Sequence, residues 1–345
     1  MILVLATFAA AFFFAVNIGA SGTAAAMSAA YGAGAVQSRR AAVWLVAVCA
    51  FLGANFGGAE VVRTLGKGII PHELSGSEIT LIILISACMT LFYANRLGLP
   101  LSTSEVTVGS IVGVGVAFQQ IHWPTLFAII AAWLMLPVCA LLIAFAIRKL
   151  CAKIGRKETV RLGMSAKWLS CLLIAAGCYE AFSAGMNNVG NAVGPLIGAG
   201  LIDIRTGVFF GAVFLALGAI TLGGKVLETG GKKIASLTLA QGSIASFTSG
   251  SLVIAASLFG IPVPLTQATT MAIIGAGSDA LCLRVFKQPV VRKILKIWSL
   301  SPFISMLVSL ILVEAFIMHS ALFLWIFASV FVTTACLLYV KLKTV

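Results

Sequence analysis

The chain has few charged residues. Lys, Arg, Asp and Glu make up only 10% of its 345 residues, 61% are hydrophobic, and the mean hydropathy is +1.11. Soluble domains carry about a quarter charged residues, so this composition excludes an ordinary soluble protein. Segments of alternating polar and apolar residues are also absent, so helices must satisfy the backbone hydrogen bonds in a membrane. The sequence therefore predicts an all-α polytopic membrane protein.

Signatures of metal and catalytic sites are missing as well. The eight cysteines are scattered singly through apolar segments without metal spacing, and we interpret them as small core residues. His72, His122 and His319 lie in or near loops, with no HExxH or GxSxG pattern nearby. An intramembrane enzyme would need a nucleophile–base pair or a metal cluster. The sequence predicts a protein that is not an enzyme and has no metal or cofactor.

Acidic residues are outnumbered by basic ones, and the net charge is +13. The basic excess is concentrated in residues 148–167 and 284–296. Because basic loops stay on the cytoplasmic side, we interpret the excess as a topology signal rather than a nucleic-acid site. This puts Arg39 and Arg40 inside and the N-terminus outside. The predicted location is the cytoplasmic membrane, crossed many times.

Eleven apolar stretches are long enough to span a bilayer, and ten to twelve transmembrane segments are expected because several are short or interrupted by glycine. They lie near 1–20, 41–58, 79–95, 102–120, 125–147, 168–185, 206–222, 241–260, 263–282, 294–316 and 319–340. The first stretch lacks a basic leading region and a small-residue cleavage site. It is expected to be a retained helix rather than a signal peptide.

Three sequence blocks occur twice, in the same order and at nearly constant shifts of 162 to 166 positions. They are GASGTAAAMSAAYGAG (19–34) on GMNNVGNAVGPLIGAG (185–200), TLGKGI (64–69) on TGGKKI (229–234), and GLPLSTSEVTVGSIVGVG (98–115) on GIPVPLTQATTMAIIGAG (260–277). The predicted organisation is an N-terminal transmembrane repeat (1–150), a basic cytoplasmic linker (151–166) and a C-terminal transmembrane repeat (167–345).

The second repeat is expected to be inverted, because an odd number of spans separates the starts of the two copies. Two inverted repeats with discontinuous, Gly- and Pro-interrupted helices are typical of secondary transporters, which bind substrate near the membrane midplane. We expect broken helices at Gly19–Ala25 and Gly185–Asn191, with the second dipping into the membrane without crossing it. Irregular backbone at this depth is tolerated only where protein or a watery cavity surrounds it. Exposed helix N-termini there would face a bound anion.

These elements resemble those of the inorganic phosphate transporter (PiT) family. In the proteins of that family, each half of the chain carries a Gly-x-Asn-Asp-x-x-Asn element and a Pro-x-Ser-Thr-Ser/Thr element. Here GMNNVGN (185–191) matches the first element in the second half, and PLSTS (100–104) matches the second element in the first half. The resemblance covers essentially the whole chain and implies a transporter of a tetrahedral oxyanion.

The chain departs from the phosphate pattern where that family has carboxylates. The first half has Ser21 and Gly22 in place of Asn-Asp, and the second half has Asn188 in place of Asp. Pro264 and Leu265 replace the Ser and Thr of the second Pro-x-Ser-Thr element. Together these changes are similar to the sulfate permease branch of the family.

Hydrogen-bond chemistry favours the same branch. Phosphate near neutral pH keeps a proton that a carboxylate can accept, whereas sulfate only accepts hydrogen bonds. A sulfate site therefore needs donors and no nearby negative charge. Small polar residues also line helix contacts in membranes, which is the structural alternative. The candidate substrate-binding residues are Ser21, Gly22, Thr23, Ser102, Thr103, Ser104, Asn187, Asn188, Asn191 and Thr266.

Import of a dianion requires a coupling ion, because an inside-negative potential opposes it by about 2.3 kcal/mol per charge per 100 mV. With the family carboxylates missing, a proton is favoured over sodium. Intramembrane carboxylates are functional candidates by default. Glu105, next to Ser104, and Glu180, shortly before the Asn element, are the predicted coupling residues. A salt bridge or a side chain reaching the membrane surface is the structural alternative for Glu105.

The sequence thus predicts a secondary active transporter that imports sulfate with protons across a lipid bilayer, with no nucleic-acid partner. A phosphate or other oxyanion symporter of the same family is the close alternative. A passive anion channel is the remote one, and a homodimer is left open.

Overall fold

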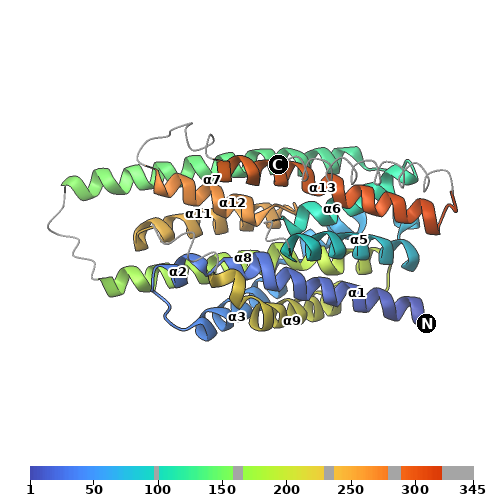
Figure 1. The fold of residues 1–345 in the computed structure, drawn as a ribbon, viewed down its shortest axis with the longest axis horizontal. Coiled ribbons are helices and arrows are strands. Elements are labelled where there is room, and N and C mark those ends of the chain that lie inside the picture. Colours follow the sequence, from blue (N-terminus) through green and yellow to red (C-terminus); the bar gives the residue numbers. More distant parts are fainter. Residues whose placement is uncertain (97–100, 158–165, 229–236, 279–288, 321–345) are drawn as a thin grey trace, which may run out of the picture.

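The computed structural model describes residues 1–96, 101–157, 166–228, 237–278 and 289–320. Within these ranges the regular secondary structure is entirely helical, which confirms the predicted fold class. Most of the long helices run along the long axis of an elongated molecule (Figure 1).

The elements of the first half follow one another without a strand in the described ranges. They are α1 (Ile2–Ile18), the π-helical turn η1 (Gly19–Thr23), α2 (Ser28–Gly32), α3 (Arg39–Gly57), α4 (Ala59–Arg63), the π-helical turn η2 (Thr64–Gly68), the short η3 (His72–Leu74), α5 (Ser77–Arg96), α6 (Thr103–Ala117) and α7 (Trp123–Lys157). The elements of the second half are α8 (Ala166–Gly198), α9 (Ile204–Leu222), α11 (Leu239–Leu258), α12 (Leu265–Gly277) and α13 (Pro289–Phe316).

Eight helices in the described ranges are long and apolar enough to cross a membrane. They are Ile2–Thr23, Arg39–Gly57, Ser77–Ala94, Trp123–Lys153, Ala166–Gly198, Ile204–Leu222, Leu239–Leu258 and Trp298–Phe316. With 15 and 13 residues, α6 and α12 are too short to cross a hydrocarbon core of about 30 Å. The spans predicted near 102–120 and 263–282 are thus short helices. The span predicted at 319–340 lies almost wholly outside the described residues.

Helix boundaries in the second half follow those of the first at the shifts found in the sequence. Both ends of α9 lie 165 positions after those of α3, and both ends of α11 lie 162 positions after those of α5. The starts of α6 and α12 are also 162 positions apart. Local folding is therefore duplicated. The inverted relation of the halves and the exact number of crossings stay predictions, and most of the predicted linker lies outside the described residues.

The first copy of the Gly-rich element interrupts its helix as predicted, but the second copy does not. After α1 the backbone forms η1 and a turn before α2, whereas α8 continues without a break from Ala166 to Gly198. The broken helix expected at Gly185–Asn191 is therefore wrong. The glycine there serves close packing instead, because a Cβ on Gly185 would collide with a backbone carbonyl of α3. Gly53 of α3 makes the reciprocal close approach to α8.

The helices form two layers joined by two linking helices (Figure 1). One layer holds α6, α7, α12 and α13, in which α6 packs on α13 and α12 packs on α7. The other layer holds α1, α3, α8 and α9. Between them, α5 packs on α1 and α6, and α11 packs on α8 and α12. Each contact thus has its repeat-related counterpart.

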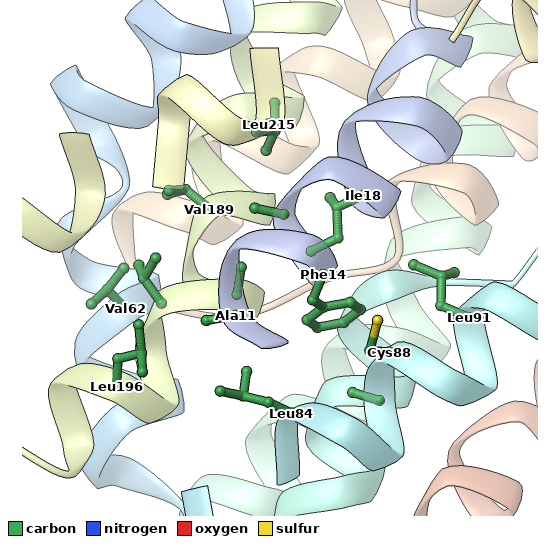
Figure 2. Packing of buried hydrophobic residues seen from close by; sticks show 14 of the residues in the cluster. Ala11, Phe14, Ile18, Val62, Leu84, Cys88, Leu91, Val189, Leu196 and Leu215 are labelled. Atoms are coloured by element: carbon green, nitrogen blue, oxygen red, sulfur yellow. The ribbon is translucent and has the colours of Figure 1, made fainter. Parts of the chain in front are cut away.

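The second layer has a tightly packed apolar core. Figure 2 shows Phe14 and Ile18 of α1 packed among Leu84 of α5, Val189 of α8 and Leu215 of α9. All five side chains are almost fully buried. Because lipid is as apolar as these side chains, close packing rather than the hydrophobic effect holds the helices together. This core holds the middle of α8 in place, next to the Asn residues.

Candidate anion-binding site

The three Asn side chains of α8 face the first turn of α6. Asn187, Asn188 and Asn191 are at most 2% exposed. The Thr103 hydroxyl donates to Asn188 Oδ1 at 3.0 Å, and the Ser104 hydroxyl donates to Asn187 Oδ1 at 3.3 Å. Asn191 Nδ2 donates to both hydroxyl oxygens at 3.3 Å. Polar groups from the two layers therefore meet in one buried cluster.

The segment that precedes α12 belongs to the same cluster. Asn187 Nδ2 donates to the Ile261 carbonyl at 3.1 Å, and Asn187 Oδ1 accepts from the Val263 N–H at 3.1 Å. The Ser104 hydroxyl also lies 3.1 Å from the Val263 carbonyl, to which it donates. Side chains of α8 and α6 therefore hold the non-helical backbone at residues 260–264.

The π-helical turn η1 contributes Thr23 and Gly22. Asn188 Nδ2 donates to Thr23 Oγ1 at 3.5 Å, and Thr23 is fully buried. A Cβ on Gly22 would lie 3.9 Å from Thr266 Cγ2, so η1 and the start of α12 are neighbours. Ser21 differs from the other predicted residues, because its hydroxyl donates to the backbone carbonyl four residues earlier at 2.9 Å.

Ser102 is buried and caps α6 instead of facing the Asn cluster. Its hydroxyl accepts from the Glu105 N–H at 3.3 Å, the usual arrangement of a helix N-cap. The helix start carries partial positive charge and lies against the Asn cluster. α12 begins after Pro264 with no side-chain cap. Both short helices therefore start at the cluster.

Hydrogen bonding within the cluster is nearly complete. Every Asn amide nitrogen already donates to a protein oxygen. Two buried atoms of the cluster have no hydrogen-bond partner among the described residues, Asn191 Oδ1 and Thr266 Oγ1. An incoming anion would therefore have to replace internal hydrogen bonds rather than fill a set of free donors.

Glu105 is 3% exposed and lies at the start of α6. It accepts hydrogen bonds from Gln267 Nε2 of α12 and from the Ser301 hydroxyl of α13. The ion pairs between described residues lie elsewhere, between Arg39 and Glu228 and within α4. Glu105 thus forms neither the salt bridge nor the surface contact of the structural alternative.

Glu180 is 1% exposed and lies on α8, about 10 Å before Asn187 along the helix. Its carboxylate accepts from the Ser249 hydroxyl of α11 at 2.7 Å and from the Thr269 hydroxyl of α12. The Ser246 side chain hydrogen-bonds it as well. Among the residues that the structure describes, no hydrogen bond joins it to the three Asn residues, so it forms a second polar site on the same helix.

Some residues of these sites were not singled out from the sequence. Gln267 is one of them, although its position 162 residues after Glu105, the same repeat position, could have pointed to it. Trp133 is a second case: its indole N–H donates to the Pro262 carbonyl at 2.8 Å and holds the segment before α12. The pattern Trp-x-x-x-Pro occurs at 133–137 and again at 298–302, a fourth repeated element.

Two short helices that begin at a buried polar cluster between two helical layers define the class of multi-pass membrane transporters. The chain matches the model of the Phosphate transporter family over residues 18–309, and it belongs to that family. This confirms the resemblance seen in the sequence. Relatives in the family are named as transporters and permeases rather than as enzymes.

Individual relatives carry names of two kinds. The chain is 47% identical to the sulfate permease CysP of Bacillus subtilis, over 92% of this chain and 89% of that protein. It is 26% identical to a putative phosphate permease of Pyrococcus furiosus, over 81% of this chain and 88% of that protein. A solved structure described as the sodium-dependent phosphate transporter superposes with a TM-score of 0.80 at 24% identity, over 90% of this chain and 98% of that chain. This last likeness bears on the fold alone.

Proposed function

We propose that this protein is a secondary active transporter that imports sulfate across the cytoplasmic membrane together with protons. The observation that carries the proposal is the uncharged cluster of Asn187, Asn188 and Asn191 at the starts of α6 and α12. A fully deprotonated anion can bind such a cluster without meeting a like charge. The 47% identity to a protein named sulfate permease supports the same substrate.

The proposed ligands are the groups nearest the contact between the two layers. The sulfate oxygens would receive hydrogen bonds from Thr103, Ser104, Asn188, Asn191 and Thr266. The backbone of Gly22 and the hydroxyl of Thr23 would close the site from η1. Ser102 and Asn187 would act through the backbone that they hold, at α6 and at residues 260–264. Ser21 is the weakest candidate, because its hydroxyl bonds its own helix.

The location of the cluster suggests how access could alternate. α8 and η1 belong to one layer and α6 and α12 to the other, so the anion would be bound between two bodies. Rocking one body against the other would expose the site to either side in turn, as in other repeat transporters. The linking helices α5 and α11 would accommodate the movement.

Glu105 and Glu180 are the proposed coupling residues. Both are buried, and both accept hydrogen bonds from α12, the helix that begins at the anion cluster. A change in the protonation of either carboxylate would therefore alter its hydrogen bond to α12. Sodium stays the less favoured coupling ion, because Gly22 and Asn188 stand where the family pattern has carboxylates.

Transport of phosphate is the second candidate function, favoured by the family to which the chain belongs and by relatives named phosphate permeases. Against it stands the Asn at position 188, which can donate to an anion where a carboxylate would repel a dianion.

Reconstitution into proteoliposomes tests the proposal. Labelled sulfate should accumulate above its equilibrium level when an inward proton gradient is imposed, and a sodium gradient alone should have no effect. Equilibration without accumulation would identify a passive channel. A complete lack of sulfate uptake under any gradient would refute the proposed substrate.

A further inference from the structure

Two acidic side chains in the described ranges are almost fully buried, Glu105 and Glu180. An ionised carboxylate removed from water costs several kcal/mol unless a cation or hydrogen bonds compensate it. The ion pairs of the described residues involve other acids, Glu60 and Glu228, which are about half exposed. These two carboxylates must therefore be compensated in another way.

Within the described ranges, the groups that hydrogen-bond Glu105 are all neutral. Its partners are the Gln267 amide and the Ser301 hydroxyl. α8, which also packs on α6, presents the Asn amides described above. The charged side chains Glu78 of α5, and Lys296 and Glu314 of α13, are not among its hydrogen-bond partners. An amide or a hydroxyl can bond either a carboxylate or a carboxylic acid, so this environment serves both protonation states.

The Glu180 site has the same character. Its partners are the hydroxyls of Ser246, Ser249 and Thr269. The adjacent titratable groups of α8 are engaged elsewhere: the Tyr179 hydroxyl lies 3.2 Å from the Ser251 hydroxyl, and the Cys178 thiol hydrogen-bonds Cys49 of α3. Hydroxyl groups, like the amide of Gln267, can donate or accept. Both carboxylates thus lie in sites suited to gain and lose a proton.

The internal repeat shows that neither carboxylate has a second copy. The position 166 residues before Glu180 is Phe14, and the positions 162 residues before Ser246 and Ser249 are Leu84 and Ala87. These three side chains are buried in the apolar core, where Figure 2 shows Phe14 and Leu84. A polar site in the second half is therefore replaced by hydrophobic packing in the first.

Glu105 lacks a carboxylate at its repeat-related position for a different reason. Its counterpart is Gln267, the neutral residue of similar shape to which it is hydrogen-bonded. The contact between the repeat-related residues places the two at the meeting point of α6 and α12. Among the described residues there are therefore two buried carboxylates, Glu105 at the contact of α6 with α12 and Glu180 at the hydroxyl site on α8.

We infer that Glu105 and Glu180 each carry one proton during transport, so that two protons accompany one sulfate dianion and the cycle is electroneutral. This inference rests on the proposed function. Two protons on two carboxylates balance the two negative charges of sulfate. The transported load is then neutral, and the membrane potential that opposes the import of a dianion does not act on it.

The stoichiometry can be measured in proteoliposomes with the membrane potential set by potassium and valinomycin. At zero potential, sulfate should accumulate about 100-fold per unit of pH difference for two protons, against about tenfold for one. Setting the potential inside-negative should leave the accumulation unchanged. An accumulation of about tenfold, or a dependence on potential, would overturn the inference while leaving proton-driven sulfate import intact.

Variants at the carboxylates provide the second measurement. Glu180→Gln keeps the shape of the side chain and should lower the accumulation of sulfate to about tenfold per unit of pH difference. An inside-negative potential should now oppose the uptake. The matched control is Glu78→Gln, at an exposed position in the first turn of α5, which should keep the wild-type dependence. If Glu180→Gln keeps the 100-fold dependence, the assignment is wrong. If it does not fold, the wild-type slope and its potential dependence still decide.

Discussion

At the scale of single residues, the site is made of amides and hydroxyls that bond one another across the layers. The Thr103 hydroxyl links two of the Asn residues, because it donates to Asn188 and accepts from Asn191. Such chains of hydrogen bonds reinforce one another in a low dielectric. The two unpaired oxygens, Asn191 Oδ1 and Thr266 Oγ1, show where the network is incomplete.

Replacement of Thr103 by Val tests the network. Val has nearly the same shape but lacks the hydroxyl, so Asn188 and Asn191 each lose a partner. We expect the apparent affinity for sulfate to fall roughly tenfold, corresponding to a loss of about 1–2 kcal/mol. Thr107→Val, one turn further along α6, is the control, because the Thr107 hydroxyl bonds only the backbone of its own helix at 2.9 Å. Equal effects of the two variants would contradict a direct role for Thr103.

At the scale of elements, the short helices and the segment before α12 determine the shape of the site. Residues 260–264 are held at Asn187 and Ser104 on one side and at Trp133 on the other. The indole N–H of Trp133 bonds the Pro262 carbonyl rather than a member of the Asn cluster. It is a positioning residue, since it acts through the Pro262 carbonyl.

Trp133→Phe removes the indole N–H and keeps an aromatic ring. The Pro262 carbonyl then loses its partner, and the segment that binds Asn187 becomes less well defined. We expect KM for sulfate to rise severalfold, for a hydrogen bond of about 1 kcal/mol, while the maximal rate changes less. Trp123→Phe, at the exposed start of α7, should leave both unchanged. A proportional loss of maximal rate at constant KM would argue against a positioning role.

The element scale also shows how far the sequence could be interpreted. The apolar stretches predicted near 102–120 and 263–282 begin within two residues of the starts of α6 and α12. Ser102 caps α6, and α12 begins directly after Pro264. The break at Gly185 was wrong, because glycine in a membrane helix can serve close packing as readily as irregular backbone. The partners of Glu105 and Glu180 could not be predicted, since they come from helices distant in the sequence and depend on tertiary packing.

At the scale of the whole molecule, the polar cluster lies where one layer meets the other. Transport by rocking requires the contact between η1 and α12 to open and close. Contacts inside a layer, such as that of α3 with α8, should persist throughout the cycle. The duplicated arrangement places α5 and α11 as the connections between the moving parts.

A cross-link between the layers should arrest transport. Gly22→Cys combined with Thr266→Cys would place two thiols on neighbouring segments of the two layers, since a Cβ on Gly22 would lie 3.9 Å from Thr266 Cγ2. Oxidation should stop sulfate uptake by the double variant. A reducing agent added afterwards should restore the uptake that the variant shows before oxidation. The natural pair Cys49 and Cys178, within one layer, is the control, and its oxidation should leave uptake intact. Uptake by the oxidised double variant would contradict relative movement of the layers.

The central claim is that an uncharged cluster on α8, α6 and α12 selects sulfate. The most direct test is the initial rate of labelled sulfate uptake into proteoliposomes in a large excess of unlabelled phosphate. A rate that is indifferent to phosphate is the predicted result, since the site lacks a carboxylate to accept the phosphate proton. A rate abolished by phosphate would contradict the claim and would assign the site to phosphate.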